Sequence, residues 1–289
     1  MTAPAHVTAL AGLLNGDRLL SVPGCWDGIT AFLIEQAGFP VAFLSGGALS
    51  MGRFGRPDIG LVTATELTET TAILRDRIQI PLIVDGDTGF GNALTLQRLV
   101  RNLERAGASA VQIEDQGFPK RCGHMAGKTV VPLSEAVGRI KAALDTREHM
   151  LILARTDALG VEGLKSALDR AEAFLEAGAD IIFVEGPRTT EELEAVASRF
   201  AARAPLVHNL VEGGITPTES GKDLEALGFR IALHPLLLLH SLVARAPALL
   251  ATLKAEKSTT SLAPELIRLK DMNSMLDAAG LLATGDRYG

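Results

Sequence analysis

The chain has 289 residues, of which 47% are hydrophobic and only 4% aromatic, so it can bury a large core packed mainly by aliphatic side chains. A formal net charge of -6 without a long basic run argues against a nucleic-acid partner. Two cysteines, Cys25 and Cys122, are too few for a disulfide framework and favour a reducing compartment, so we expect a cytoplasmic protein. The start shows no signal-peptide pattern. Histidine, arginine and proline interrupt the most apolar stretch, 231–253, which argues against a membrane span.

A unit of one helix followed by one short strand recurs along the chain. In each copy an Ala-Gly or Leu-Gly pair, typical of a helix C-terminus, precedes a short apolar run that ends on a polar residue. The copies predict strands at Val41–Ser45, Ala110–Glu114, Ile181–Glu185 and Ile231–His234. Further strands are predicted between them, at Leu19–Val22, Pro81–Asp85, Met150–Ala154 and Pro205–Asn209.

Apolar strands that alternate with helices in this way predict an α/β fold with a closed parallel sheet, a (β/α)8 or TIM barrel. An open doubly wound sheet is the alternative. No linker-like segment divides the chain, so we expect one barrel domain over 1–289, with 255–289 as a C-terminal helical extension. Apolar positions in that extension, among them Leu266, Ile267 and Met275, need a partner, so we expect a homo-oligomer.

Polar residues stand at the carboxyl ends of most predicted strands, which is where barrel enzymes carry their chemistry. In chain order these residues are Ser45, Asp85, Glu114, Arg155, Glu185, Asn209 and His234. Packing alone does not explain so many polar ends on apolar strands. The pattern therefore indicates an active site at this end of the barrel.

Acidic residues at two neighbouring strand ends indicate a metal site. Asp85 and Asp87 are two residues apart, so their side chains point to one side, and Glu114 ends the next strand. These carboxylates can supply oxygen ligands to Mg²⁺, directly or through water, and Asp58 on a loop is a weaker candidate. The structural alternative is a plain turn at Asp87-Thr88-Gly89.

Two further features can hold an anionic substrate. Backbone N–H groups of Ser45-Gly46-Gly47 can bind a carboxylate or phosphate, and the guanidinium fork of Arg155 matches a carboxylate. The alternatives are a glycine turn at 45–47 and an ion pair between Arg155 and Asp157 or Glu185. Near the first strand, Cys25 is expected to be a buried packing thiol and Asp27 a helix N-cap.

The segment Pro119–Lys128 combines a thiol, an imidazole and three cations: Cys122, His124, Lys120, Arg121 and Lys128. A cationic setting lowers the pKa of a thiol and holds anions. We interpret this segment as a mobile flap that carries Cys122 as an acid–base group over an anionic substrate. A solvated basic loop with an incidental cysteine is the alternative.

Taken together, these segments resemble the isocitrate lyase/phosphoenolpyruvate mutase superfamily. The segments that carry the resemblance are 45–47, 57–58, 85–91, 113–116, 119–124, 154–158 and 209–217. The resemblance implies a barrel with Mg²⁺, or alternatively Mn²⁺, at its mouth, and a tetramer built as a dimer of dimers that exchange a C-terminal helix. The Lys-Arg-Cys-Gly-His loop marks the carbon–carbon lyase branch, which includes 2-methylisocitrate and 2,3-dimethylmalate lyases. The carboxyphosphonoenolpyruvate mutases carry a similar loop.

The resemblance further implies cleavage of a 2-hydroxy di- or tricarboxylate, of the alkylmalate or methylisocitrate type, to a 2-oxo acid such as pyruvate and a second carboxylate. We expect Cys122 to donate a proton while Lys120, Arg121 and His124 offset the developing negative charge. The expected substrate-binding residues are Ser45, Gly46, Gly47, Arg155, Glu185, Asn209 and Thr216. The alternatives are an oxaloacetate decarboxylase or hydrolase, a phosphonomutase, and a non-catalytic barrel that binds a 2-oxo acid.

Trp26, Phe43, His208 and His234 depart from the residues usual in that superfamily. We expect these side chains to line the substrate pocket and to change the choice of substrate more than the type of reaction. For His208 and His234 the alternative is a satisfied imidazole in the core.

Overall fold

The computed structural model describes residues 2–123, 125–214 and 220–289, so His124 and Thr216, two predicted site residues, lie outside the described residues. The chain forms two compact units, Met1–Leu239 and His240–Gly289, and each is considered by itself.

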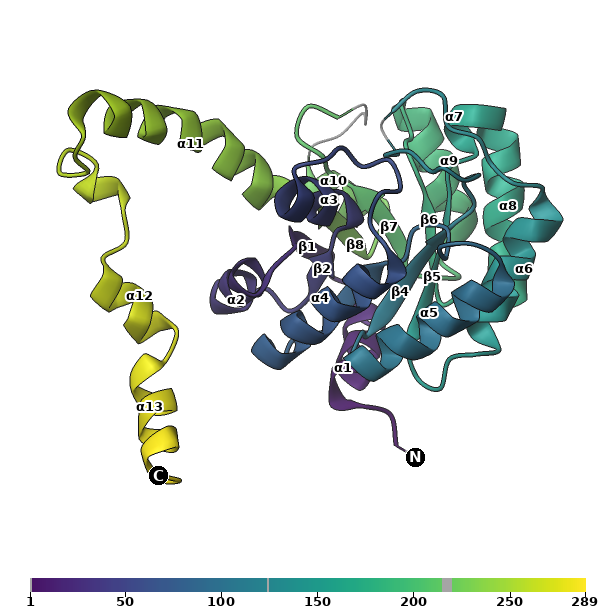
Figure 1. Cartoon of the computed structure of the whole chain (residues 1–289). Helices are drawn as coiled ribbons and strands as arrows, with labels where there is room; N and C mark the ends of the chain where they lie inside the picture. Colours follow the sequence, from purple (N-terminus) through teal and green to yellow (C-terminus); the bar gives the residue numbers. More distant parts are fainter. Residues whose placement is uncertain (1, 124, 215–219) are drawn as a thin grey trace. The chain divides into compact units, whose positions relative to one another are not determined.

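The first unit is built on a closed barrel of eight parallel strands, in which β8 pairs back with β1 (Figure 1). The strands are β1 (Leu20–Cys25), β2 (Ala42–Leu44), β3 (Leu82–Asp85), β4 (Ala110–Glu114), β5 (Leu151–Thr156), β6 (Ile181–Val184), β7 (Leu206–Asn209) and β8 (Ile231–His234). Each predicted strand is present, so the (β/α)8 fold is confirmed and the open sheet is excluded.

Helices alternate with these strands along the chain. The helices up to β8 are α1 (Ala5–Leu14), α2 (Gly28–Gln36), α3 (Gly46–Phe54), α4 (Ala64–Arg77), α5 (Ala93–Ala106), α6 (Leu133–Leu144), α7 (Leu159–Glu162), α8 (Leu164–Ala177), α9 (Thr190–Phe200) and α10 (Gly221–Ala226). Local signals set their ends. Asp27 caps α2 in a capping box with Thr30, as expected. Gly107 and Gly178 end α5 and α8 at φ values of 92° and 106°.

Side chains along each strand alternate between the barrel interior and the helix layer. The interior cluster includes Phe43, Ile83, Leu153 and Phe183 and also contains Leu10 of α1. Residues next to them in sequence, such as Leu44, Val84 and Ile152, belong to the outer cluster that includes helix side chains. Apolar side chains fill the interior, and many of the buried polar and charged side chains lie at the carboxyl ends of the strands, among them Asp85, Glu114 and Arg155.

Strand β1 continues past the predicted end at Val22 to Cys25. This extension requires glycine at position 24, since a Cβ there would lie 2.1 Å from the backbone oxygen of Pro235. Cys25 is fully buried and its thiol donates to the carbonyl of Phe43 at 3.4 Å, which confirms the expected packing role.

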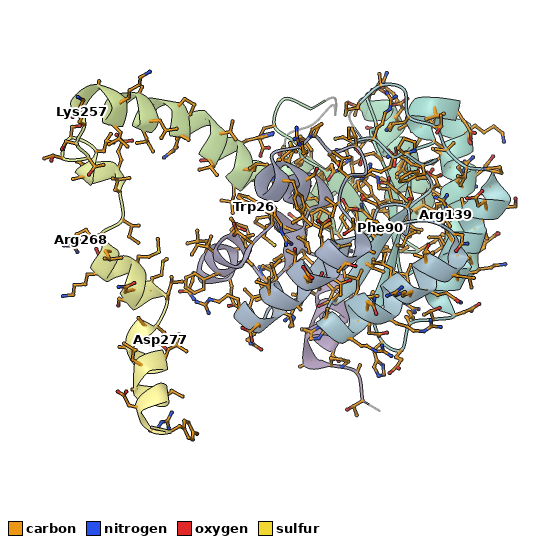
Figure 2. All side chains as sticks on the ribbon, in the orientation of Figure 1. Trp26, Phe90, Arg139, Lys257, Arg268 and Asp277 are labelled. Carbon is orange, nitrogen blue, oxygen red and sulfur yellow. The ribbon has the colours of Figure 1, made fainter. Side chains whose placement is uncertain are left out.

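The second unit is helical. Helix α11 (Leu237–Glu256) begins in the first unit, and η1 (Ala263–Glu265), α12 (Leu269–Met275) and α13 (Ala278–Asp286) follow it. Large apolar side chains on these helices are exposed, among them Leu250 at 63% and Leu269 at 76%. Figure 2 draws the side chains of this unit as sticks and labels Lys257, Arg268 and Asp277. Helix α11 is long and apolar enough to cross a membrane by length and composition, but one such helix is weak evidence for a span.

Candidate active site

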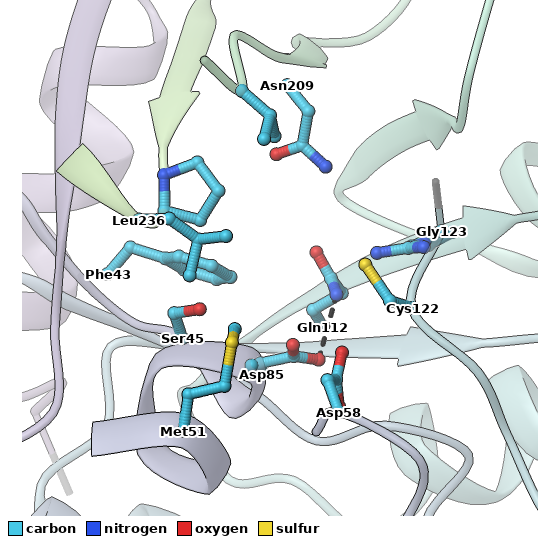
Figure 3. A pocket seen from close by; sticks show the side chains of 14 residues that line it. Phe43, Ser45, Met51, Asp58, Asp85, Gln112, Cys122, Gly123, Asn209 and Leu236 are labelled. Carbon is cyan, nitrogen blue, oxygen red and sulfur yellow. Dashed lines mark hydrogen bonds between the residues drawn. The ribbon is translucent and has the colours of Figure 1, made fainter. Parts of the chain in front are cut away.

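A pocket opens at the carboxyl ends of the strands (Figure 3). It is lined by Phe43, Ser45, Gly47, Met51, Asp58, Asp85, Gln112, Cys122, Gly123, Arg155, Asn209, Val211, Pro235 and Leu236. Half of these were predicted as site residues from the sequence: Ser45, Gly47, Asp58, Asp85, Cys122, Arg155 and Asn209. The fold therefore brings the flap cysteine, the acids, the arginine and the helix N-terminus of α3 to one place.

Asp85 ends β3 and Asp87 lies on the tight turn that follows, so the turn named as the alternative and the acid cluster are both present. The turn is closed by the N–H of Gly89, which donates to the carbonyl of Gly86 at 3.0 Å, and Asp87 has a left-handed φ of 48°. The carboxylate of Asp85 accepts the backbone N–H of Asp87 and that of Gly46, each at 3.3 Å. Asp85 thus joins the end of β3 to the start of α3.

Lys120 lies between two acids of this cluster. Its Nζ is 2.5 Å from Asp58 Oδ1 and 2.7 Å from Asp87 Oδ1, and its side chain is almost fully buried. Burial disfavours the charged ammonium, but Asp87, Asp58, Glu114 and Asp85 outweigh it and hold the pKa of Lys120 well above its ordinary value. Lys120 therefore stays cationic and occupies the acid cluster.

One ammonium does not neutralise the four carboxylates around it. Burial raises the pKa of Asp87 to about 7, against the opposing effect of Lys120. Burial also raises the pKa of Glu114 well above its ordinary value, and its buried Oε1 accepts no hydrogen bond from the described residues. This excess of buried negative charge fits a divalent cation. Within the described ranges no three His, Cys, Asp or Glu side chains form a ready ligand set, which fits a cation that keeps several water or substrate ligands.

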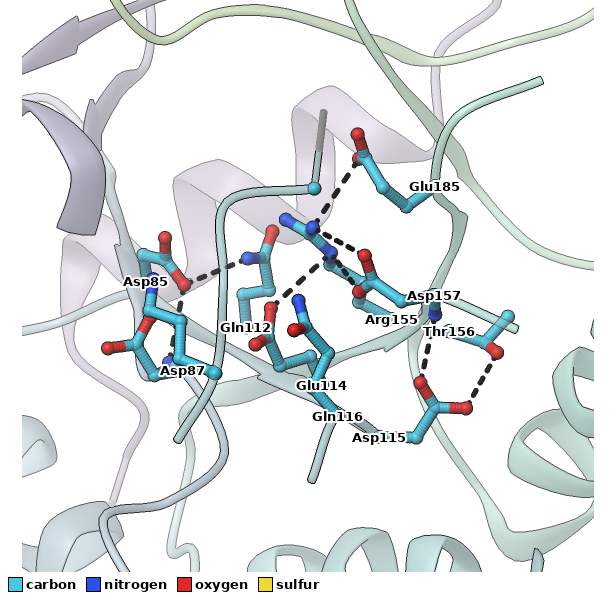
Figure 4. Close-up of polar contacts among 12 residues, drawn as sticks. Asp85, Asp87, Gln112, Glu114, Asp115, Gln116, Arg155, Thr156, Asp157 and Glu185 are labelled. Carbon is cyan, nitrogen blue, oxygen red and sulfur yellow. Dashed lines mark hydrogen bonds and ion pairs between the residues drawn. The ribbon is translucent and has the colours of Figure 1, made fainter. Parts of the chain in front are cut away.

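Arg155 on β5 forms a second charged cluster (Figure 4). Its Nε and Nη2 bind the two carboxylate oxygens of Asp157 at 2.9 and 3.1 Å. Nε also lies 3.5 Å from Glu114, and Nη2 lies 3.8 Å from Glu185. The ion pair named as the alternative is thus present. Because Asp157 takes the Nε–Nη2 edge, a ligand carboxylate in the pocket would approach Arg155 from its Nη1 side.

Three buried hydrogen bonds extend this cluster. The side chain of Asn209 on β7 donates from Nδ2 to Glu185 Oε2 at 2.9 Å, which places both predicted residues together. Asp115 accepts the Thr156 hydroxyl at 2.7 Å and the backbone N–H of Asp157 at 2.8 Å. Together these bonds fix the ends of β5, β6 and β7 around the pocket.

The cysteine loop lies directly on this cluster. The N–H of Cys122 donates to the backbone carbonyl of Asp58 at 3.1 Å, and its half-buried side chain faces the pocket. A Cβ at Gly123 would lie 2.4 Å from Arg155 Nη2 and 2.7 Å from Glu185 Oε1, so a larger residue would require the loop or these two side chains to move. Lys128 Nζ donates to the carbonyl of Gly123 at 2.5 Å and to Asp157 Oδ1 at 2.8 Å.

Arg121 is not brought to the pocket. It is exposed, and its Nη1 donates to the carbonyl of Ala126 at 3.0 Å within the loop. Its backbone forms two hydrogen bonds with the side chain of Gln116, at 3.0 and 2.8 Å. Arg121 therefore stabilises the loop, and the charge-offsetting role expected for it does not fit this arrangement.

Three of the four positions that depart from the superfamily pattern, Trp26, His208 and His234, are not among the residues that line the pocket. Phe43 lines the pocket as expected. His208 does not, because strand alternation turns it to the face opposite Asn209, where its ring meets the edge of Phe229 at 5.8 Å between centroids. Trp26 packs over Gly52 of α3, outside the pocket lining.

Sequence reasoning missed Gln112. It lines the pocket and donates from Nε2 to Asp85 Oδ1 at 2.9 Å. The signal was available, because Gln112 precedes Glu114 by two residues on β4 and shares its face.

These observations define a (β/α)8 barrel enzyme with a buried acid cluster, an arginine and a thiol-bearing loop at one pocket. The chain belongs to the phosphoenolpyruvate phosphomutase family, whose model matches residues 10–253.

Curated relatives include enzymes of several activities. 2,3-Dimethylmalate lyase of Eubacterium barkeri is 38% identical over 266 residues, 91% of this chain and 91% of the relative. 2-Methylisocitrate lyase of Aeropyrum pernix is 43% identical over 226 residues, 78% of this chain and 72% of the relative. The chloroplastic carboxyvinyl-carboxyphosphonate phosphorylmutase of Arabidopsis thaliana is 37% identical over 282 residues, which are 96% of this chain and 83% of the relative.

Solved structures agree with this placement. 2,3-Dimethylmalate lyase, described as a PEP mutase/isocitrate lyase superfamily member, superposes with a TM-score of 0.91 at 30% identity, covering 100% of this chain and 96% of that one. Oxaloacetate acetylhydrolase in complex with the inhibitor 3,3-difluorooxalacetate superposes with a TM-score of 0.91 at 30% identity, covering 98% of this chain and 97% of that one. Phosphonopyruvate hydrolase in complex with oxalate and Mg²⁺ superposes with a TM-score of 0.88 at 28% identity, covering 99% of each chain. The superfamily and the assignment to its carbon–carbon lyases, both made from the sequence, are confirmed.

Proposed function

We propose that the chain is a Mg²⁺-dependent lyase that cleaves a 2-hydroxy di- or tricarboxylate, of the alkylmalate or methylisocitrate type, into a 2-oxo acid such as pyruvate and a second carboxylate. The observation that carries this proposal is the shared pocket of Cys122, Asp85 and Arg155. A proton donor, an acid cluster suited to a cation and a carboxylate-binding group line the same pocket.

Asp85 and Asp87 would hold the cation, with Glu114 and Asp58 acting through water. Mn²⁺ is the alternative metal, and the Mg²⁺–oxalate complex of phosphonopyruvate hydrolase supports a divalent cation at a carboxylate-binding site. When bound, the cation makes a substrate hydroxyl easier to deprotonate. Arg155 and the N–H of Gly47 would bind the carboxylate of the future 2-oxo acid, because Asp85 already takes the N–H of Gly46.

Cys122 would donate the proton that quenches the carbanion left on the second product when the carbon–carbon bond breaks. Lys120 stays cationic within the acid cluster and would offset the negative charge that develops nearby. The loop, held by Lys128, would exclude water during this step. His124 and Thr216 remain proposed participants by family resemblance, and Glu185 with Asn209 would border the second product.

A second candidate function is hydrolytic cleavage of oxaloacetate. It is favoured by the oxaloacetate acetylhydrolase complex, which matches this chain as closely in TM-score as the dimethylmalate lyase does. A phosphonomutase activity is supported by the Arabidopsis relative. A non-catalytic 2-oxo-acid binder is the weakest alternative, because the cysteine lies in the pocket with the acids.

The exposed apolar side chains of the second unit support a homo-oligomer, which we propose to be a dimer of dimers that exchange this helical unit. The cytoplasmic location remains a prediction from the two cysteines.

The proposal is tested with a substrate panel of 2,3-dimethylmalate, 2-methylisocitrate, oxaloacetate and phosphonopyruvate, assayed with Mg²⁺. We expect turnover of a hydroxy acid in the wild type and a loss of about 10²-fold or more in kcat for Cys122→Ser. Binding of Mg²⁺ and pyruvate by that variant should be retained. Turnover of oxaloacetate alone would assign the second function, and near-normal lyase turnover in Cys122→Ser would remove Cys122 from the mechanism.

A further inference from the structure

Arg170 is a buried cation of the outer helix layer that reaches the base of the cysteine loop. It lies on α8, is only 4% exposed and is absent from the pocket lining. Its Nη1 donates to Asp115 Oδ2 at 3.2 Å and to the backbone carbonyl of Val131 at 2.9 Å. Glu162 accepts from Nε and Nη2 at 3.2 and 3.3 Å, so the other edge of the guanidinium is held as well.

The two acceptors of Nη1 lie on the two sides of the loop stem, which we define as residues 115–117 and 129–131. An antiparallel bridge joins the two sides. The N–H of Val131 also donates to the backbone carbonyl of Asp115 at 2.9 Å. Arg170 thus ties together the incoming and outgoing ends of the loop that carries the thiol.

Asp115 links the same guanidinium to the carboxylate-binding cluster. Its side chain accepts the Thr156 hydroxyl at 2.7 Å and the backbone N–H of Asp157 at 2.8 Å (Figure 4). Asp157 in turn binds Nε and Nη2 of Arg155 and the ammonium of Lys128. The position of Asp115 therefore bears on the edge of Arg155 that is left for a ligand and, through Lys128, on the loop itself.

The burial of these groups makes the contact costly to lose. Asp115 is 1% exposed, and a buried carboxylate deprived of its cation is strongly destabilising. Without Arg170 the carbonyl of Val131 would also lose a charged donor, so the stem must shift to regain hydrogen bonds from water. A lysine ammonium cannot reproduce the fork with which one guanidinium serves Asp115, Val131 and Glu162 together.

We infer that Arg170 is a positioning residue that holds the cysteine loop and Arg155 in fixed relation, so that the proton donor and the carboxylate-binding group face the same substrate. It acts through Asp115 and Val131 and touches no reacting atom. This inference deepens the proposed lyase function and rests on it for the roles of Cys122 and Arg155.

The test compares full-length Arg170→Met and Arg170→Lys with the wild type and with Arg75→Met as the matched control. Arg75 on α4 also donates to backbone carbonyls, those of Gly107, Ile78 and Ile80. These carbonyls precede β4 and β3 and so lie at the opposite end of the barrel. Both methionine variants lose hydrogen bonds to the backbone and should have a lower Tm, but only the loss at Arg170 should reach the pocket.

Two quantities are measured at a temperature at which circular dichroism shows every variant folded. The first is kcat at saturating Mg²⁺ on the hydroxy acid that the wild type turns over. The second is the rate at which iodoacetamide alkylates Cys122 without substrate, followed by mass spectrometry, with the fully buried Cys25 as internal reference. We expect Arg170→Met to lower kcat by about tenfold or more and to speed alkylation by about tenfold, because the loop leaves its packed position. Arg170→Lys should recover part of both.

The inference stands if both quantities change in Arg170→Met and neither changes in Arg75→Met; any other result with an active wild type overturns it. Should Arg170→Met fail to fold, Asp115→Asn takes its place, because it keeps the size of the side chain and removes the charge that binds Arg170. A wild type that turns over no hydroxy acid would contradict the proposed function, and the alkylation rate alone would then decide the role of Arg170.

Discussion

Lys128 joins the cysteine loop to Asp157, a fully buried carboxylate, through an ion pair of 2.8 Å. The same ammonium holds the carbonyl of Gly123, so one side chain ties the residue after Cys122 to the Arg155 cluster. Burial disfavours the ionised carboxylate, but Arg155 and Lys128 outweigh it and lower the pKa of Asp157.

The first prediction concerns this ion pair. Lys128→Met should loosen the loop, lower kcat by about tenfold and increase hydrogen exchange across residues 118–130. Lys128→Arg should restore part of the protection. Lys165→Met, which removes an exposed surface ion pair, is the matched control and should change neither quantity. Unchanged loop exchange in Lys128→Met would contradict the anchoring role.

The second prediction concerns Gly123. Gly123→Ala places a methyl group against Arg155 Nη2 and Glu185 Oε1, so either the loop or the two charged side chains must move from this arrangement. We expect a loss of about 10²-fold in kcat/KM with little change in Tm, since the barrel itself is untouched. Gly138→Ala on α6, where a Cβ meets nothing within 4 Å, controls for a general effect of the substitution. Wild-type kcat/KM in Gly123→Ala would show that the close contact is not needed for turnover.

The third prediction concerns the pH dependence of metal binding. Burial raises the pKa of Asp87 to about 7, so below that pH its carboxyl is protonated and a cation must displace the proton. The apparent Mg²⁺ affinity should therefore rise as pH increases from about 5.5 to 7, by at most about tenfold per unit for one proton, and then level off. Calorimetric titrations at several pH values measure this. Asp87→Asn should bind Mg²⁺ more weakly and lose most of the slope; a slope that persists in that variant would assign the proton elsewhere.

The fourth prediction concerns the helical second unit. Leu250→Glu and Leu281→Glu place charges on side chains that are 63% and 68% exposed in the isolated chain. If these side chains are buried between subunits, each change should shift the assembly toward smaller species, measured by light scattering coupled to size-exclusion chromatography. Lys270→Glu, a charge reversal on α12, is the control. A wild-type protein that is monomeric at micromolar concentration would refute the proposed oligomer.

Much of the barrel could be predicted from local pattern. Every strand could be located from two local signals: apolar runs that end on a polar residue, such as 110–114, and glycine caps of helices, such as Gly107 and Gly178. Both signals depend on only a few neighbouring residues. The sequence also predicted that the acids and Arg155 lie at one site, because all parallel strands of a barrel present their carboxyl ends at the same rim. The sequence did not decide which side chains turn inward: His208 alternates away from the pocket, which fits the core-imidazole alternative, and of the neighbours Lys120 and Arg121 only Lys120 turns inward.

The sequence by itself thus determined the strand order, the superfamily and the set of chemical groups at the mouth, since each is carried by short segments with their own physical signals. Only the tertiary structure decided which groups meet. It placed Lys120 between Asp58 and Asp87, closed Gly123 on Arg155 and brought Arg170 to the loop stem. Those relationships join residues far apart in the chain, and their distances depend on how strands and loops pack around the whole barrel.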